Sequence, residues 1–283
     1  MGPNYFHNAD ISVLKTYDAA TVQTAFNSIV KDYQIEFTFQ QGGCQQRAQI
    51  VSMLLQKKFN IEHHKIWLFA PAAFDVTDSR TLFIDDNSKL SPDNIVNWNY
   101  HVAILVQVLT ADGYVETTVI DPSINPSKPI TTTQWFDSMM NSFLGKYTFT
   151  DAGKYFFDCF PSNNLSSLIF NGVFTDYTDY EKDNLVVEKG LAINDMVISI
   201  YRTHILPLMQ STEMEDLQKL EDLKSIFGNA TALDLLLAQN ISGQTENTTL
   251  RYVITNYSAI MGEARAILFK RLTYWTHLLN SLL

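Results

Sequence analysis

The spacing of apolar residues changes near residue 185, and this change constrains the fold of the 283-residue chain more than any other feature. Before residue 185 the chain is cut into short segments by turn-forming residues, whereas after it apolar residues recur at helical intervals. The sequence therefore predicts an α+β domain over residues 1–184 and an all-helical domain over residues 185–283. With 46% hydrophobic residues, the chain can bury one large core or two modest ones.

The second part is expected to hold three helical segments. A capping box over residues 212–215 opens a helix that Gly228 ends. A similar start over residues 231–234 leads into three leucines. The last segment, residues 248–282, predicts a long amphipathic helix that is broken at Gly262.

The first part is expected to alternate helices and strands. The expected helices cover residues 21–33 and 45–59, and the expected strands cover residues 35–39, 65–69, 102–109 and 114–120. Residues 70–97 are rich in Asp, Asn, Ser and Pro, so they are expected to form a long excursion on the surface.

Cys44 follows two glycines that allow the backbone to turn sharply between the expected strand and helix. This places Cys44 in the first turn of the helix, where free N–H groups and the positive end of the dipole favour an anion. That position, together with a nearby imidazolium, favours the thiolate form of a nucleophile. Taken alone, a cysteine at such a junction is more often a small buried hydrophobic residue.

His101 and Asp121 lie near the two open ends of an expected hairpin, whose turn includes residues 111–113. If the hairpin is centred on Ala111, the two residues face each other with Cβ atoms roughly 4.5–5.5 Å apart. If it is centred one residue later, they are diagonal neighbours about 7–8 Å apart. In either register Asp121 can orient the imidazole while its other nitrogen addresses the sulfur of Cys44. Each residue alone has an ordinary structural explanation, so the spacing alone leaves the triad a minority interpretation.

Three segments resemble the protein-glutaminase family of protein-glutamine deamidases. They are the nonapeptide 98–106 around His101, the run 119–123 around Asp121 and, less specifically, the motif Gly-Cys-x-x-Arg-Ala at 43–48. The similarity covers roughly residues 22–136 and extends weakly to Trp135. Extra residues separate Cys44 from His101, and the helical region after residue 185 has no counterpart in the family.

The resemblance implies a papain/transglutaminase-like core, with an antiparallel sheet and a helix that carries the nucleophile. It implies that Cys44 is the nucleophile, that His101 is the general base and acid, and that Asp121 orients the imidazole. The implied reaction is hydrolytic deamidation of glutamine side chains in a protein substrate, through a thioester intermediate.

Further residues are assigned from this mechanism. The Cys44 backbone N–H stabilises the oxyanion, and the other expected site residues there are Gly43 and Gln41 or Gln40. Trp98 and Tyr100 are candidates for the walls of a slot that holds the methylenes of the glutamine, although aromatic residues beside a strand are more often part of the core.

Other functions use the same triad or none. A cysteine peptidase or ubiquitin-processing protease ranks second, and a transglutaminase, which admits an amine in place of water, ranks third. The non-enzymatic alternative is a helical interaction module with a vestigial triad. The C-terminal helices are expected either to bind a partner protein or to serve as a structural buttress.

Charge and cysteine content exclude several classes of protein. The formal net charge is −10, so neither nucleic acid nor an anionic membrane surface is an expected partner. Two cysteines cannot build a disulfide framework, and Cys159, in an aromatic stretch, is expected to be buried and inert. His63 and His64 are adjacent, which is poor geometry for one metal ion, so neither a metal nor a cofactor is expected.

The location expected from the sequence follows from absent signals. No stretch reaches the roughly 18 uninterrupted apolar residues that a spanning helix needs, so a soluble protein is expected. The first residues lack the basic and apolar regions of a Sec signal. A site that modifies proteins then favours a bacterial effector, with toxin or virulence activity, that is secreted into host cytoplasm by a specialised system. An enzyme of the bacterial cytoplasm is the alternative.

Overall fold

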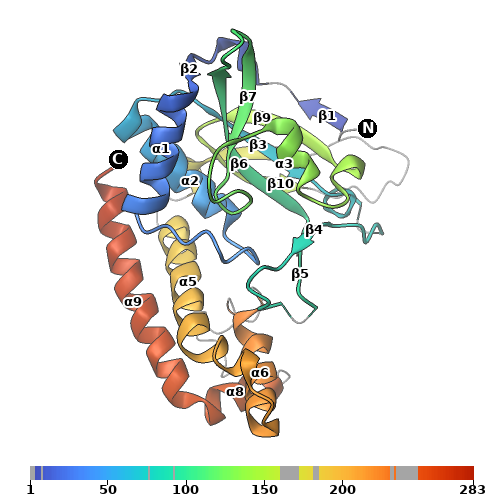
Figure 1. Cartoon of the computed structure of the whole chain (residues 1–283), viewed down its shortest axis with the longest axis vertical. Helices are drawn as coiled ribbons and strands as arrows, with labels where there is room; N and C mark the ends of the chain where they lie inside the picture. Colours follow the sequence, from blue (N-terminus) through green and yellow to red (C-terminus); the bar gives the residue numbers. More distant parts are fainter. Residues whose placement is uncertain are drawn as a thin grey trace.

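The structure is a computed structural model of the chain and is shown in Figure 1. It describes residues 4–7, 9–75, 77–91, 93–159, 172–180, 185–229, 233 and 248–283. A mostly antiparallel sheet packs on helices in the first part, and the described elements after residue 185 are all helical. The predicted α+β class, the sheet and the C-terminal helices are therefore confirmed.

The central sheet has the strand order β1-β9-β3-β6-β7-β8, and β2 pairs with one end of β6. Pairs β1–β9 and β2–β6 are parallel, and the other neighbouring strands are antiparallel. The strands are β1 (Asn4–His7), β2 (Thr16–Asp18), β3 (His64–Phe69), β6 (Tyr100–Leu109), β7 (Val115–Ile120), β8 (Ile130–Thr131) and β9 (Lys146–Asp151). The strands predicted at 65–69, 102–109 and 114–120 are thus confirmed as β3, β6 and β7.

Both faces of the sheet are buried, each in a core of its own. Successive side chains of a strand point to opposite faces, so neighbouring residues belong to different cores. Trp67 and Phe69 of β3 belong to a core shared with α1 (Ala19–Asp32) and α2 (Cys44–Leu54). The alternate residues of β3, Ile66 and Leu68, belong to a second core under α3 (Thr132–Asp137). Figure 1 shows α1 and α2 together on one side of the sheet and α3 on the other. The two predicted helices are confirmed, and α2 continues through a π-helical turn over Leu55–Phe59.

The strand predicted over residues 35–39 does not form. Ile35, Phe37 and Phe39 are buried in alternation, as the pattern predicts, but the segment pairs with no described strand. An extended segment that lies between two packed surfaces buries alternate residues without a hydrogen-bonded neighbour. The period of two therefore indicates alternating burial, which does not require a sheet.

The prediction of a surface excursion over residues 70–97 is wrong for its second half. This half contains an antiparallel pair of strands, β4 (Leu82–Asp85) and β5 (Ile95–Trp98). Between them Asp86 is only 3% exposed, because its carboxylate accepts hydrogen bonds from the backbone N–H groups of Ser88 and Ser91. Asp86, Ser88 and Ser91, three of the polar residues that suggested a surface loop, are therefore internal hydrogen-bonding groups.

The C-terminal helices are α5 (Val186–Ile200), α6 (Met214–Phe227), α8 (Thr248–Asn256) and α9 (Ser258–Asn280). Helices α5 and α9 lie side by side (Figure 1). The first half of α5 also contributes Val187 and Leu191 to the core shared by α2 and the sheet. The domain boundary at 184/185 stays a prediction.

Two details of the helical prediction are wrong. The capping box at 212–215 does not form, because Ser211 instead receives the N–H of Glu213 and donates to Asp216. The last helix breaks at Tyr257 rather than at Gly262, and the Tyr257 hydroxyl donates to Asp222 of α6 at 2.7 Å. A local hydrogen-bond network thus accompanies the first change, and a hydrogen bond between helices accompanies the second. The start predicted at 231–234 lies outside the described residues.

The remaining elements form a second two-stranded sheet beside α2. Strands β10 (Lys154–Cys159) and β11 (Gly172–Asp176) are antiparallel and lead into α4 (Tyr177–Tyr180). Cys159 ends β10, and its side chain lies outside the described ones. In the described ranges, no helix has both the length and the hydropathy to cross a bilayer, and no cluster of three or more His, Cys, Asp and Glu side chains could hold a metal ion.

Candidate active site

The position of Cys44 depends on the backbone of Gly43. Gly43 has φ of +79°, a left-handed backbone conformation that residues other than glycine rarely adopt. It is the last residue of the turn before α2. A Cβ atom on Gly43 would lie 2.4 Å from the amide of Asn194 on α5. Cys44 is the first residue of α2, and its thiol is free and partly exposed. The predicted placement of Cys44 at a helix start, after a glycine turn, is thus confirmed.

His101 and Asp121 meet at the neighbouring ends of β6 and β7. The strands pair Ile104 with Ile120 and Leu105 with Val119, which centres the hairpin on Asp112. Of the two registers that the sequence allows, the structure has the second, in which His101 and Asp121 are diagonal neighbours. Their side chains close this diagonal with a 2.7 Å hydrogen bond between Nε2 and Oδ2.

Asp121 is only 7% exposed, and each of its oxygens has further partners. Oδ1 accepts from the backbone N–H of Ser123 at 3.2 Å and from its hydroxyl at 2.5 Å. Oδ2 also accepts from Nε1 of Trp135 at 2.8 Å. Burial raises the pKa of Asp121, but the charge and hydrogen bond of His101 and the bonds from Ser123 and Trp135 outweigh it and lower the pKa to about 2. The carboxylate is therefore ionised and fixed in orientation.

The imidazole of His101 stacks with two indoles. Its ring centroid lies 4.4 Å from that of Trp98 and 5.6 Å from that of Trp135. Burial lowers the pKa of His101, but the charge and hydrogen bond of Asp121, with contributions from Cys44, raise it to about 9. The ring is therefore held as an imidazolium at neutral pH.

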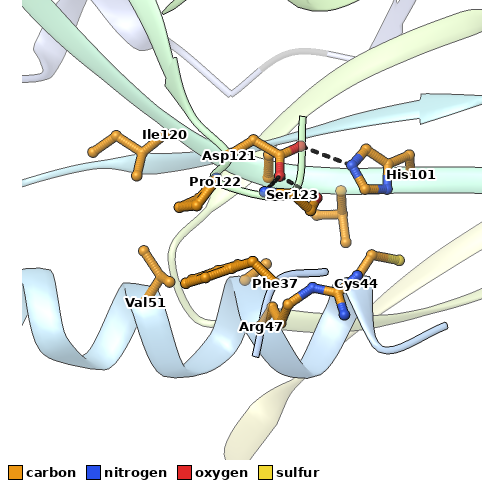
Figure 2. A pocket seen from close by; sticks show the side chains of 12 residues that line it. Phe37, Cys44, Arg47, Val51, His101, Ile120, Asp121, Pro122 and Ser123 are labelled. Carbon is orange, nitrogen blue, oxygen red and sulfur yellow. Dashed lines mark hydrogen bonds and ion pairs between the residues drawn. The ribbon is translucent and has the colours of Figure 1, made fainter. Parts of the chain in front are cut away.

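Cys44, His101 and Asp121 line one pocket (Figure 2). Asp121 lies at the Nε2 side of the imidazole, and Cys44 lies below the ring on the side of Nδ1. Nδ1 is buried and has no oxygen or nitrogen partner in the part of the chain that the structure describes. The sulfur of Cys44 is thus the group placed to exchange a proton with it.

The other predicted site residues have different positions. Gln41 donates to Asp86 at 2.7 Å and to Ser91 at 3.2 Å, and Gln40 donates to the carbonyl of Ser123 at 2.6 Å. Both amide nitrogens are therefore engaged in this structure, and an oxyanion role for either residue stays a prediction.

The two aromatic residues predicted to wall the substrate slot lie apart from the pocket lining. Trp98 stacks on His101 and donates from Nε1 to the carbonyl of Gln40 at 2.8 Å, so it joins the segment before Cys44 to the imidazole. Tyr100 lies among aromatic residues of β3, with its ring centroid 5.8 Å from that of Trp67. Contact of either residue with a substrate stays a prediction.

Two residues at the site were not given a role from the sequence. Trp135 binds Asp121 and stacks near His101, and its only signal was a weak family resemblance. Arg47 lines the pocket one turn after Cys44 and is only 4% exposed. The Gly-Cys-x-x-Arg-Ala motif includes this arginine, three residues after the cysteine. The motif does not indicate that the arginine is buried or what its guanidinium contacts.

Replacing Gly43 with alanine is expected to destabilise the fold by about 1–3 kcal/mol, because it combines backbone strain with a collision against Asn194. The matched control is Gly113→Ala, at φ of +82° with nothing within 4 Å of the added Cβ. Thermal unfolding of both variants separates the two causes. Equal losses of stability in the two variants would mean that the Asn194 side chain moves aside without destabilising the fold.

The pH dependence of stability should report the ion pair of His101 and Asp121. Because the pKa of His101 is raised from 6.5 to about 9, its contribution is complete below pH 6.5 and is lost as the pH rises through 9. Because the pKa of Asp121 is lowered from 3.8 to about 2, its contribution is complete above pH 3.8 and is lost as the pH falls through 2. The window of full stabilisation therefore runs from about pH 4 to about pH 6.5.

We expect the free energy of unfolding of the wild type to exceed that of Asp121→Asn most within this window. The pH-dependent part of the difference should be on the order of 3 kcal/mol, since one pKa unit corresponds to about 1.4 kcal/mol. Urea unfolding at several pH values from 5 to 10 measures it. A difference that stays constant over this range would contradict the pairing.

The part of the chain that holds this site matches a known protein family. Residues 22–139, which include Cys44, His101 and Asp121, match a family model of the glutamine-deamidase type that is described as glutaminase. No protein with curated annotation matches the chain significantly in sequence.

Three solved structures are similar in fold. The NMR structure of protein-glutaminase from Chryseobacterium proteolyticum has a TM-score of 0.46 and 23% identity, over 65% of this chain and 89% of that chain. A crystal structure of protein-glutaminase has a TM-score of 0.43 and 23% identity, over 62% and 85%. A crystal structure of pro-protein-glutaminase has a TM-score of 0.45 and 22% identity, over 70% and 62%.

Proposed function

We propose that the protein hydrolyses the side-chain amide of glutamine residues in a protein substrate, because residues 22–139 match a family model described as glutaminase. The observation that carries the proposal is the pocket in which the partly exposed thiol of Cys44 faces the buried pair of His101 and Asp121. A thiol, an imidazolium and an orienting carboxylate are the groups that acyl transfer through a thioester requires.

In the first half of the proposed reaction, the Cys44 thiolate adds to the carbonyl carbon of the glutamine amide. The resulting oxyanion receives the N–H of Cys44, which as the first residue of α2 has no partner within the helix. The imidazolium of His101 then gives its Nδ1 proton to the departing nitrogen, and the C–N bond breaks. Ammonia leaves, a thioester remains on Cys44, and His101 is neutral.

In the second half, neutral His101 removes a proton from water, which attacks the thioester carbon. The C–S bond breaks, the substrate leaves as glutamate, and the thiolate–imidazolium pair is restored. Asp121 does not take a proton in either half, which agrees with its pKa of about 2. Its contribution is to fix the ring and to favour the imidazolium that each cycle forms.

The experiment is incubation of the protein with a folded protein or a peptide that contains glutamine. We expect ammonia release and a mass gain of about one dalton per modified glutamine. Incorporation of a fluorescent amine in place of conversion of glutamine to glutamate would indicate a transglutaminase, which also releases ammonia. A new N-terminus would indicate a peptidase. No ammonia and no change in mass across a panel of glutamine substrates would refute the proposal.

A further inference from the structure

Arg47 lies in the wall of the same pocket, one helical turn after Cys44. Residues three apart on a helix share a face, so the guanidinium and the thiol are on the same side of α2. In Figure 2 the Arg47 side chain extends along the pocket toward Cys44. Arg47 is 4% exposed, although arginine is almost never buried to this extent without a partner.

The guanidinium of Arg47 is paired on one side only. Nη1 donates to the carbonyl of Phe39 at 2.8 Å. In the amide orientation that its neighbours require, Asn194 accepts from the same Nη1 at 3.1 Å and donates to the carbonyl of Gly190 at 3.3 Å. Nη2 is buried and has no hydrogen-bond partner among the residues that the structure describes.

An unpaired buried N–H of a charged group is costly, so such a group in a native structure needs an explanation. No carboxylate of the described residues forms an ion pair with Arg47. The acidic groups whose charge reaches it are Cys44, Asp121 and Glu36. Asp121 is bound to His101, and Glu36 is bound to Arg202 at 3.0 Å. The remaining place for a negative charge is the reacting end of the pocket, at Cys44.

We propose that Nη2 of Arg47 donates hydrogen bonds to the oxyanion that forms when Cys44 adds to the substrate carbonyl, and that Asn194 of α5 is the positioning residue that holds the guanidinium there. The inference rests on the proposed function and adds a second donor to the N–H of Cys44. A donor fixed in a water-poor pocket, directed to where charge develops, stabilises the transition state more than the ground state.

The arrangement also gives the C-terminal helical region a part in the site. Asn194 contacts Arg47 with its amide oxygen, and the same amide lies against Gly43, where a Cβ would approach to 2.4 Å. Helix α5 therefore touches both the turn before Cys44 and the proposed oxyanion donor. A catalytic segment without α5 would lose both contacts.

The decisive experiment compares Arg47→Met and Arg47→Lys with the wild type in ammonia release from a glutamine peptide, with rates expressed per alkylatable Cys44. We expect kcat of Arg47→Met to fall by about 10²- to 10³-fold while KM changes by less than about threefold. Arg47→Lys keeps the charge but loses the planar fork and should show an intermediate loss. An unchanged kcat in folded Arg47→Met, or a loss confined to KM, would overturn the assignment.

A control and a second measurement guard against a variant that is only destabilised. Arg271→Met removes a part-buried arginine that binds Asp195 at 2.7 Å, so it should lower the melting temperature and leave kcat unchanged.

The rate of Cys44 alkylation by anionic iodoacetate, relative to the rate with neutral iodoacetamide, reports the local charge without turnover. If Nη2 faces the thiol, we expect this ratio to fall about tenfold in Arg47→Met and to fall much less in Arg47→Lys, which keeps the positive charge. An unchanged ratio in Arg47→Met contradicts the inference.

The role of Asn194 is tested by a double-mutant cycle. Asn194→Ala should lower kcat about tenfold in the wild type and should have no further effect in Arg47→Met, because it acts through the guanidinium. Additive losses would show that Asn194 has only a separate structural role. If the wild type releases no ammonia, the proposed function fails and this inference fails with it; if the wild type is active and the Arg47 variants match it, only the inference fails.

Discussion

Cys44→Ala is expected to abolish ammonia release from glutamine substrates, with a loss of at least about 10⁴-fold, because Cys44 carries the only thiol among the described residues that line the pocket. The substitution removes one sulfur atom from a partly exposed side chain that forms no disulfide. The melting temperature should therefore change little. Mass spectrometry of the substrate, together with an ammonia assay, measures the loss.

Cys159 provides the matched control for this experiment. It is the other cysteine of the sequence, and it is the last residue of β10. Cys159→Ala should retain full activity. Alkylation with iodoacetamide should then inactivate Cys159→Ala, in which Cys44 is the remaining cysteine. Residual ammonia release by Cys44→Ala above the level of the Cys159→Ala, Cys44→Ala double variant would point to another nucleophile.

Asp121→Asn is expected to lower kcat by about 10³- to 10⁴-fold while leaving the protein folded. Every partner of the Asp121 carboxylate is a donor: His101 and Trp135 at Oδ2, and Ser123 at Oδ1. An asparagine has one acceptor oxygen, so in either orientation its NH2 group faces an N–H or O–H donor. The imidazole then loses its fixed tautomer, its orientation and the carboxylate that favours the imidazolium.

The expected loss is measured as kcat from initial rates of ammonia release, with circular dichroism as a check on folding. Ser123→Ala is the matched control, because it removes one hydrogen bond from Asp121 and keeps the charge next to His101. Its loss should be no more than about tenfold. If Asp121→Asn retains activity within a few fold of the wild type, Asp121 has no place in the mechanism.

The sequence predicted the elements around the site because their apolar patterns are local. The helix after Gly43 follows from an apolar period of 3.6, and the strands β3, β6 and β7 coincide with short runs rich in apolar and β-branched residues. The hairpin register was open, since the turn residues accept either centre. The structure settles it through Gly113, which takes φ of +82°, and through hydrogen bonds between Thr110 and both Gly113 and Tyr114.

The parts that the sequence did not predict depend on contacts between segments far apart in the chain. The sequence placed Asp86 on the surface, but it is buried, and its carboxylate accepts a hydrogen bond from the side-chain amide of the distant Gln41. Arg47 had no assigned role because Asn194, its partner, lies on a helix that the family resemblance does not cover. Periodicity and composition carry no information on such pairs, so the sequence did not assign a role to Arg47 or Asn194.

The stacking of His101 with Trp98 and Trp135 limits the motion of the imidazole. A ring that stacks with two indoles and is hydrogen-bonded at Nε2 keeps one orientation, so its Nδ1 edge is the one left to exchange protons. In the proposed reaction, the departing ammonia and the incoming water would then occupy the same position in turn. Such a cycle would follow a strict ping-pong order, in which ammonia leaves before water binds.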